Sequence, residues 1–230
     1  MKDATKEKVE TETADWQYLA SLPASWHGFT FQKDMNIVGD MYDLFSYVND
    51  SRHRRVTAYY HEETKEYKLR VRIGLTEFCR IDCIVMSITD FERLLAERLE
   101  RILTELEQFL PDTMPSIVQE KKICEWDYKP YLPERYRDFV LFINPSEPVR
   151  ITNGSYIIAD YEDFAGENNF AVYYNVFRDE FFGEARIKRI PDVSYEFDSQ
   201  SLALLSKKLE ARLIPRLDEV LDRAAGIVKE

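Results

Sequence analysis

The sequence predicts an α+β fold built as a tandem duplication: two copies of an antiparallel β-meander, each followed by a long C-terminal helix. Three observations lead to this prediction, namely an internal repeat, segments in which apolar and polar residues alternate, and two long amphipathic stretches. The repeat consists of aromatic residues and Leu-Pro pairs that recur 110 residues apart. Trp16, Tyr18, Leu22-Pro23 and Phe29 match Trp126, Tyr128, Leu132-Pro133 and Phe139. A repeat at a fixed spacing indicates that one structural unit is used twice.

Further along the chain the spacing becomes 114 residues, since Tyr59-Tyr60 returns as Tyr173-Tyr174. The repeat predicts a first unit over residues 13–118 and a second over 119–230. Residues 1–12 are polar, charged and without periodicity, which is typical of a disordered tail. Because a duplicated unit can pack like a symmetric dimer, we expect a pseudo-twofold pair.

The β-meander is predicted from short segments of alternating character. In residues 67–73 the apolar side chains fall on one face and the basic ones on the other, which is typical of a half-buried antiparallel strand. A short helix is expected over residues 13–22, ending before Pro23. Other strands are expected at 29–32, 44–48, 56–61 and 78–87 in the first copy, and at 139–143, 156–161, 169–176, 180–189 and 193–197 in the second.

Each meander is followed by an amphipathic helix. In the first copy, Thr89 and Glu92 have the spacing of a capping box at a helix start. In the second copy the helix is expected to begin at Ser199. Pro215 lies inside its apolar stripe and predicts a kink or break, because proline lacks the amide hydrogen.

Composition narrows the classes of function. The net charge is −11, and acidic residues outnumber basic ones in both halves, so nucleic-acid binding is disfavoured. The sequence shows neither the apolar core of a signal peptide nor a run of membrane-spanning length, which favours a cytoplasmic protein that does not bind membranes. Three cysteines in such a chain are typical of reduced thiols.

No catalytic, metal or cofactor motif stands out. Cys79 and Cys83, if both lie on one strand, are too far apart for a shared zinc ion or a disulfide. His27, His53 and His61 belong to no metal or catalytic pattern and are interpreted as packing or surface residues. The seven glycines form no phosphate-binding loop. The sequence therefore predicts neither a bound metal nor a cofactor.

Two charged clusters distinguish the copies and are the predicted binding residues. Asp160, Glu162 and Asp163 stand where the first copy has Ser46, Val48 and Asn49, whereas Arg52, Arg54 and Arg55 stand where the second copy has Gly166, Asn168 and Asn169. Paired carboxylates on one strand face suit a cation or acid–base chemistry, and clustered arginines suit an anionic partner. The alternative interpretation is a solvated strand edge and a solvated turn.

Three functions remain open. The first is a cytoplasmic binding protein, such as an adaptor, inhibitor or immunity-type protein, whose partner is another protein. The second is a small-molecule binder that uses a groove between sheet and helix. The third is an enzyme whose residues are scattered along the sequence. Converging carboxylates in a cleft would favour the third, and a large apolar cavity would favour the second.

Overall fold

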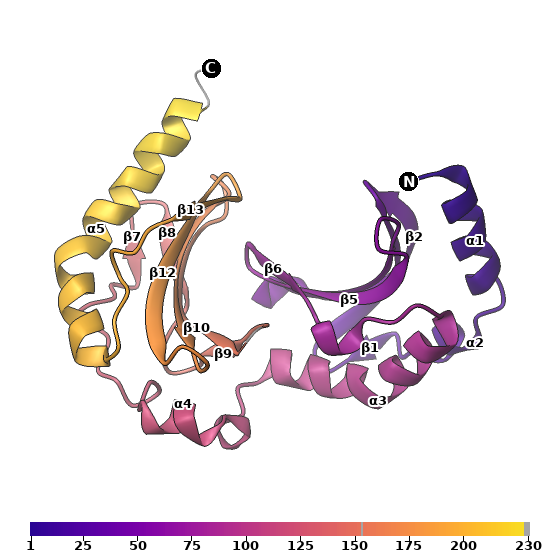
Figure 1. Ribbon diagram of the computed structural model, residues 1–230, viewed down its shortest axis with the longest axis horizontal. Coiled ribbons are helices and arrows are strands. Elements are labelled where there is room, and N and C mark those ends of the chain that lie inside the picture. Colours follow the sequence, from indigo (N-terminus) through magenta and orange to yellow (C-terminus); the bar gives the residue numbers. More distant parts are fainter. Residues whose placement is uncertain (153, 228–230) are drawn as a thin grey trace. The chain divides into compact units, whose positions relative to one another are not determined.

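The chain folds into two compact units, Met1–Gln108 and Phe109–Glu230, and the computed structural model describes residues 1–152 and 154–227. Each unit has one antiparallel sheet whose strands lie largely in chain order, with a long helix on one face (Figure 1). The α+β fold with two antiparallel meanders is therefore confirmed. The boundary lies after Gln108, earlier than the repeat alone predicts.

The first unit contains a six-stranded sheet in the order β1-β2-β3-β4-β5-β6. Helix α3 packs its apolar side chains on one face, as shown by the stacked rings of Tyr67 and Phe91, 5.6 Å apart. The elements are α1 (Asp3–Thr13), α2 (Gln17–Ser21), β1 (Ser25–Trp26), β2 (Phe29–Val38), β3 (Met41–Asn49), β4 (Arg54–His61), β5 (Glu66–Ile73), β6 (Thr76–Cys79) and α3 (Ile88–Glu107).

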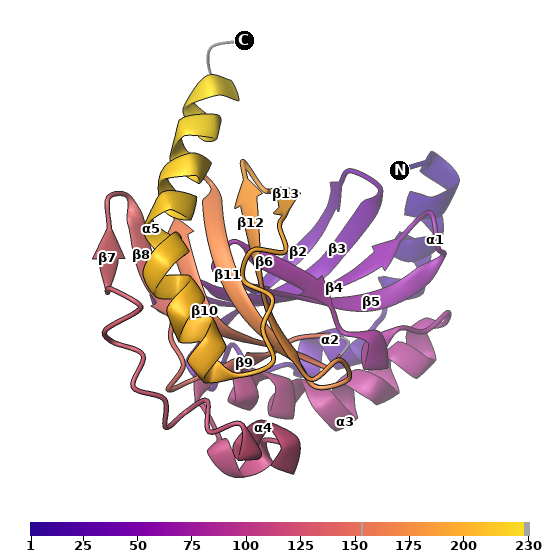
Figure 2. The same cartoon turned by 60° about the vertical axis from the view of Figure 1, so that its left-hand side comes forward.

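The second unit contains a seven-stranded sheet, and α5 crosses the face of its central strands (Figure 2). Strand β9 pairs with β10 outside the main path of the sheet. The elements are α4 (Ser116–Glu120), β7 (Arg135–Tyr136), β8 (Phe139–Ile143), β9 (Val149–Arg150), β10 (Ser155–Asp163), β11 (Asn168–Asn175), β12 (Glu180–Ile187), β13 (Ile190–Val193) and α5 (Leu202–Ile227).

The sequence repeat is also a repeat of structural detail. The Tyr47 hydroxyl donates a hydrogen bond to the Pro23 carbonyl at 2.8 Å, and the Tyr161 hydroxyl donates to the Pro133 carbonyl at the same distance. A β-bulge interrupts the register at Leu44 in the first sheet and at the matching Ile158 in the second. These shared irregularities show that both copies use one backbone plan, since bulges are specific local features and not defects.

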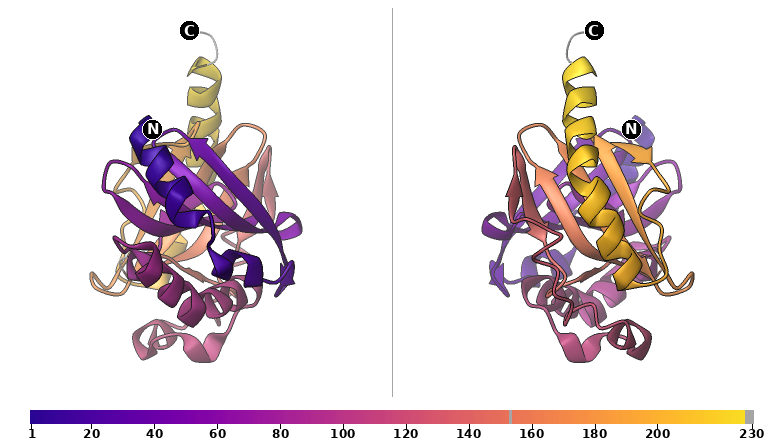
Figure 3. Two further views of the ribbon diagram at one scale, coloured as in Figure 1. Left: turned by 90° about the vertical axis from the view of Figure 1, so that its right-hand side faces the viewer. Right: turned by 90° about the vertical axis from the view of Figure 1, so that its left-hand side faces the viewer.

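The prediction of a disordered tail is wrong, because residues 3–13 form α1 and Val9 is fully buried. Figure 3 (left) shows α1 lying over the sheet of the first unit. Side chains of Glu10 and Glu12 accept hydrogen bonds from the hydroxyls of Tyr42 and Tyr67. Composition could not reveal this helix, since its carboxylates are held by partners remote in sequence.

Other local predictions also need correction. Residues 78–87 form no single strand: β6 ends at Cys79 and a 3₁₀ turn covers Ile81–Cys83. Helix α3 is capped by Ser87, whose hydroxyl accepts the amide of Asp90 at 3.1 Å, two residues before the predicted cap. Helix α5 begins at Leu202 and continues through Pro215. Within the described residues, no helix is long and apolar enough to cross a membrane.

Candidate functional site

The face of the first sheet opposite α3 carries charged side chains, and we call it the first polar face. Strand alternation sends Leu69 and Val71 of β5 into the core and places Arg70 and Arg72 on the other side. A cavity of about 300 Å³ opens on this face. Its walls are almost entirely polar and consist of Asp34, Asn36, Val38, Asp43, Arg55, Thr57, Arg70, Arg72 and Glu77.

Arg55 is the centre of a hydrogen-bond network on this face. Its guanidinium donates to the Ser46 hydroxyl at 2.8 Å and forms an ion pair with Asp34 at 3.2 Å. The Thr57 hydroxyl lies 3.2 Å from Nε of the same guanidinium. Because β2, β3 and β4 each contribute a group, the planar guanidinium is fixed by three strands.

Arg70 makes a second network beside the first. Its guanidinium binds Asp43 at 3.1 Å and reaches Glu77 at 3.7 Å. The side chain of Asp43 is buried, and loss of solvation raises the pKa of its carboxyl while the Arg70 charge opposes that shift. The cavity therefore presents guanidinium groups and carboxylates in alternation.

The structure separates the three predicted arginines. Arg55 lines the cavity, whereas Arg52 lies at the last turn of α3, where it donates to the backbone carbonyl of Glu107 and pairs with its carboxylate at 3.8 Å. A cation at a helix C-terminus is a stabilising arrangement. Arg54 occupies the alternate position on β4, opposite Ile73 of β5. Only Arg55 of the three therefore belongs to the cavity.

The predicted acidic cluster is buried, so its interpretation as a solvated edge is wrong. Asp160 and Glu162 lie on the face of the second sheet opposite α5 and have no exposed surface. Burial and the neighbouring Glu162 carboxylate raise the pKa of Asp160 well above its usual range. The Asn169 amide donates to Asp160 Oδ1 at 3.1 Å. The two acids thus form a buried pair that favours retention of a proton.

Asp163 has a local structural role that the sequence did not suggest. Its carboxylate accepts the Gly166 amide and the Asn168 side-chain amide, each at 2.8 Å, and so fixes the β10–β11 turn. Asn49, the matching residue of the first copy, likewise accepts the backbone amide of Arg52 at 3.2 Å. Both copies therefore use this position to close a turn.

Sequence reasoning missed the acidic half of the cavity. Asp34 on β2 and Asp43 on β3 come from strands whose bulges hide the alternation, since Met35 has a positive φ of 48° and the β3 register shifts after Asp43. The alternating basic residues of β5 mark this face in the sequence, whereas the acids that pair with Arg70 come from β3 and β6. Asp43 could not be found from the strands that neighbour β5, because β4 separates β3 from β5.

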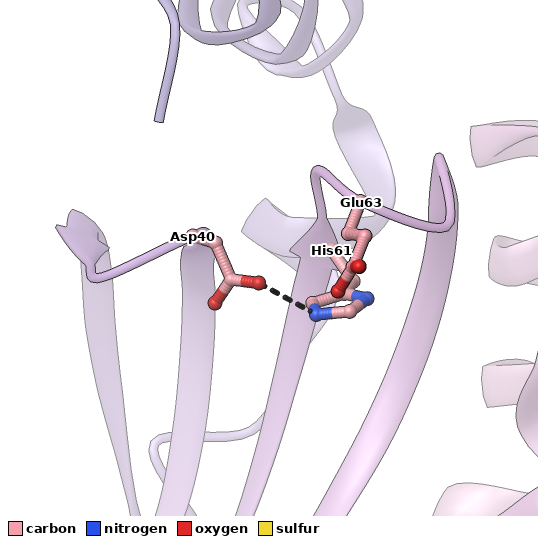
Figure 4. A group of neighbouring side chains, drawn as sticks. All are labelled: Asp40, His61 and Glu63. Atoms are coloured by element: carbon pink, nitrogen blue, oxygen red, sulfur yellow. Dashed lines mark ion pairs between the residues drawn. The ribbon is translucent and has the colours of Figure 1, made fainter.

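A third group of side chains lies at one end of the first sheet (Figure 4). Asp40, His61 and Glu63 each offer one ligand atom, and these atoms all lie within 4.8 Å of one another. His61 Nε2 is 2.9 Å from Asp40 Oδ2. Although the sequence shows no spacing motif, the fold brings together two turns and makes a group that could hold a metal ion.

The cysteines are not poised for chemistry. Cys79, Cys83 and Cys124 are free thiols, and burial raises the pKa of Cys83 to about 11. The thiolate, which is the nucleophile and the metal ligand, is therefore disfavoured at neutral pH. His27 forms an exposed pair with Glu100 at 3.3 Å.

Comparisons of the chain with protein-family models, with curated proteins and with solved structures give no match.

Proposed function

We propose that this protein is a binding protein that recognises a partner protein through the first polar face. The cavity of about 300 Å³ carries the proposal, because rigid strands hold its guanidinium groups and carboxylates in fixed positions. A charged segment of a partner, with acidic and basic side chains in turn, would complement this alternation.

The lining favours a protein partner over a small molecule. Pockets for small molecules are mostly apolar with a few polar groups, whereas Val38 is the single apolar residue among those that line this cavity. Protein interfaces have polar rims and are enriched in arginine. Val38, which is 42% exposed, adds apolar surface beside the charged groups.

The cavity does not lie in the groove between sheet and helix that the sequence suggested. The surface between the first sheet and α3 is filled by core side chains such as Phe91, Leu95 and Leu99. The cavity lies on the opposite face, where the ion pairs hold their side chains in position. Binding there needs little ordering of those side chains, which reduces its entropic cost.

Affinity capture from the source cell, quantified by mass spectrometry, tests the proposal. The double variant Asp43→Asn/Arg70→Gln keeps the net charge but removes one ion pair of the cavity. We expect a partner captured in stoichiometric amounts by the wild-type protein to be captured at least about 10-fold less by the variant, which corresponds to about 1.4 kcal/mol. Capture should also fall as salt is raised, since exposed charges are screened.

The matched control is Arg101→Gln/Glu105→Gln, which removes an exposed ion pair of 3.6 Å on α3 without changing the net charge. It should capture the partner as the wild type does. Circular dichroism must show that both variants are folded. Equal capture by the two double variants would contradict a role for the first polar face.

A small molecule with both a positive and a negative group is the second candidate, because guanidinium groups and carboxylates share the cavity. It predicts a low-molecular-mass species bound to the purified wild-type protein and absent from Asp43→Asn/Arg70→Gln. Native mass spectrometry of both proteins distinguishes this candidate from a protein partner.

A further inference from the structure

We propose that Asp40, His61 and Glu63 form a zinc-binding site at the end of the first sheet. This site shares no residue with the lining of the cavity on the first polar face and does not depend on the function proposed for that cavity. Asp40 and Glu63 supply carboxylate oxygens and His61 supplies an imidazole nitrogen, a ligand set that suits zinc and leaves a fourth position for water (Figure 4).

The backbone fixes the three ligands relative to one another. Asp40 lies in the turn between β2 and β3, whereas His61 ends β4 and Glu63 lies in the turn that follows. The Glu62 amide donates to the Asp40 carbonyl at 3.0 Å, and Met41 pairs with His61 in the sheet. The turns are therefore joined by main-chain contacts and not only by their side chains, as a pre-organised site requires.

A hydrogen-bond chain orients the imidazole of His61. Its Nδ1 lies 3.0 Å from the Thr64 hydroxyl, and that hydroxyl also hydrogen-bonds to the Glu66 carboxylate. Hydrogen bonds from Lys68 and then from Thr64 lower the pKa of Glu66, so this carboxylate is ionised and accepts the Thr64 hydrogen. When the Thr64 oxygen accepts from His61 Nδ1–H, Nε2 carries the lone pair that binds a metal ion.

The second ring nitrogen of this imidazole faces a carboxylate. Nε2 of His61 lies 2.9 Å from Asp40 Oδ2, so two atoms of kinds that bind zinc are already side by side. A carboxylate that fixes a ligating histidine through its other ring nitrogen is typical of metal sites, and here Thr64 relays the contact.

The second unit shows that the fold does not require these residues. At the 114-residue offset, Gly154, Asn175 and Phe177 stand in place of Asp40, His61 and Glu63. Asn175 accepts the backbone amides of Phe177 and Arg178, each at 3.0 Å, and so stabilises the turn itself. The donor set of the first unit is therefore an addition to the common fold, and asparagine is compatible with this position.

Competition of the purified protein with a chromogenic chelator for Zn²⁺ tests the site. We expect one zinc ion per chain, and at least about 10-fold weaker binding in His61→Asn. Thr64→Ala should weaken binding by about 10-fold, because the residues that orient ligands typically have effects of this size. Binding should also weaken as the pH is lowered from 7.5 to 5.5, because metal ions bind the deprotonated forms of their ligands.

The matched control is His27→Asn, because His27 also faces a carboxylate, Glu100, at 3.3 Å but is absent from the three-ligand group. This variant should bind zinc as the wild type does. Zinc should raise the melting temperature of the wild type and of His27→Asn but not of His61→Asn. Unchanged zinc affinity in His61→Asn, or an equal loss in both histidine variants, would overturn the proposal.

Discussion

The two sheets share a backbone plan, yet the faces opposite their long helices have different charges. In the first sheet Arg55 donates to Ser46 at 2.8 Å, and at the matching positions of the second sheet Asn169 donates to Asp160 at 3.1 Å. Ser46 and Arg55 therefore occupy the same two strand positions as Asp160 and Asn169. These positions hold a hydroxyl and a cation in the first copy, and an acid and an amide in the second. The side chain of Arg55 is 29% exposed, whereas Asp160 is fully buried.

This comparison separates what the fold needs from what it permits. The tyrosine that binds the proline carbonyl, the bulge and the turn-closing residue occur in both sheets. On the opposite face, Arg55, Arg70 and Asp160 have no counterpart of the same charge in the other copy, whereas Arg72 and Arg186 match. The side chains that differ between the copies are therefore the better candidates for function. The cavity and the group of Asp40, His61 and Glu63 both belong to the first unit.

The largest expected effect tests the equivalence of the two helices. Leu99 of α3 and Leu209 of α5 are core residues with almost no exposed surface. Leu99→Ala and Leu209→Ala should each lower the free energy of unfolding by about 2–5 kcal/mol, since each leaves a cavity in a packed core. Chemical denaturation measures the change. A loss below about 0.5 kcal/mol at either site would show that the helices are not equivalent.

A smaller pair of effects tests the shared hydrogen bond. Tyr47→Phe and Tyr161→Phe each remove a hydroxyl that donates to a proline carbonyl at 2.8 Å. Each should cost about 1–2 kcal/mol, because a hydrogen bond is lost while the ring remains packed. Thermal unfolding of both variants gives the comparison, and a loss in one variant alone would break the structural equivalence.

Asp160→Asn, unlike the preceding variants, should raise the free energy of unfolding. Burial and Glu162 raise the pKa of Asp160, so the folded state favours the protonated carboxyl. The stability that Asp160 contributes to the folded state is present below its unfolded-state pKa. This stability is lost as the pH rises through its folded-state pKa. The variant should be about 1 kcal/mol more stable than wild type at pH 8 and similar to it near pH 3.5. Melting temperatures across this range check the sign.

The smallest expected effect concerns the first polar face. Ser46→Ala removes a hydroxyl that Arg55 shares with Asp34 and Thr57, but two other partners of the guanidinium remain. Unfolding should become easier by about 0.5–1 kcal/mol, with no dependence on pH between 6 and 8. Denaturation at two salt concentrations checks this prediction, and a loss as large as that of Leu99→Ala would mean that this network is part of the core.

The repeat, the meander and the two long helices could be predicted from the sequence, because alternation and helical periodicity are local consequences of burying one face. Trp16 and Trp126 belong to matching motifs, and Phe29 and Phe139 are both fully buried. Among the predicted site residues, Arg55 lines the cavity, whereas Arg52 and Asp163 stabilise a helix end and a turn.

Tertiary structure alone decided the environment of the charged residues. The burial of Asp160 and Glu162, the pairing of Asp34 with Arg55 and the approach of Asp40 to His61 depend on strands that are distant in sequence. The sign of a charge can be read from one residue, but its solvation and its partner depend on register, bulges and turns. For the same reason α1 is an ordered helix: its carboxylates meet tyrosine hydroxyls that only the folded sheet brings within reach.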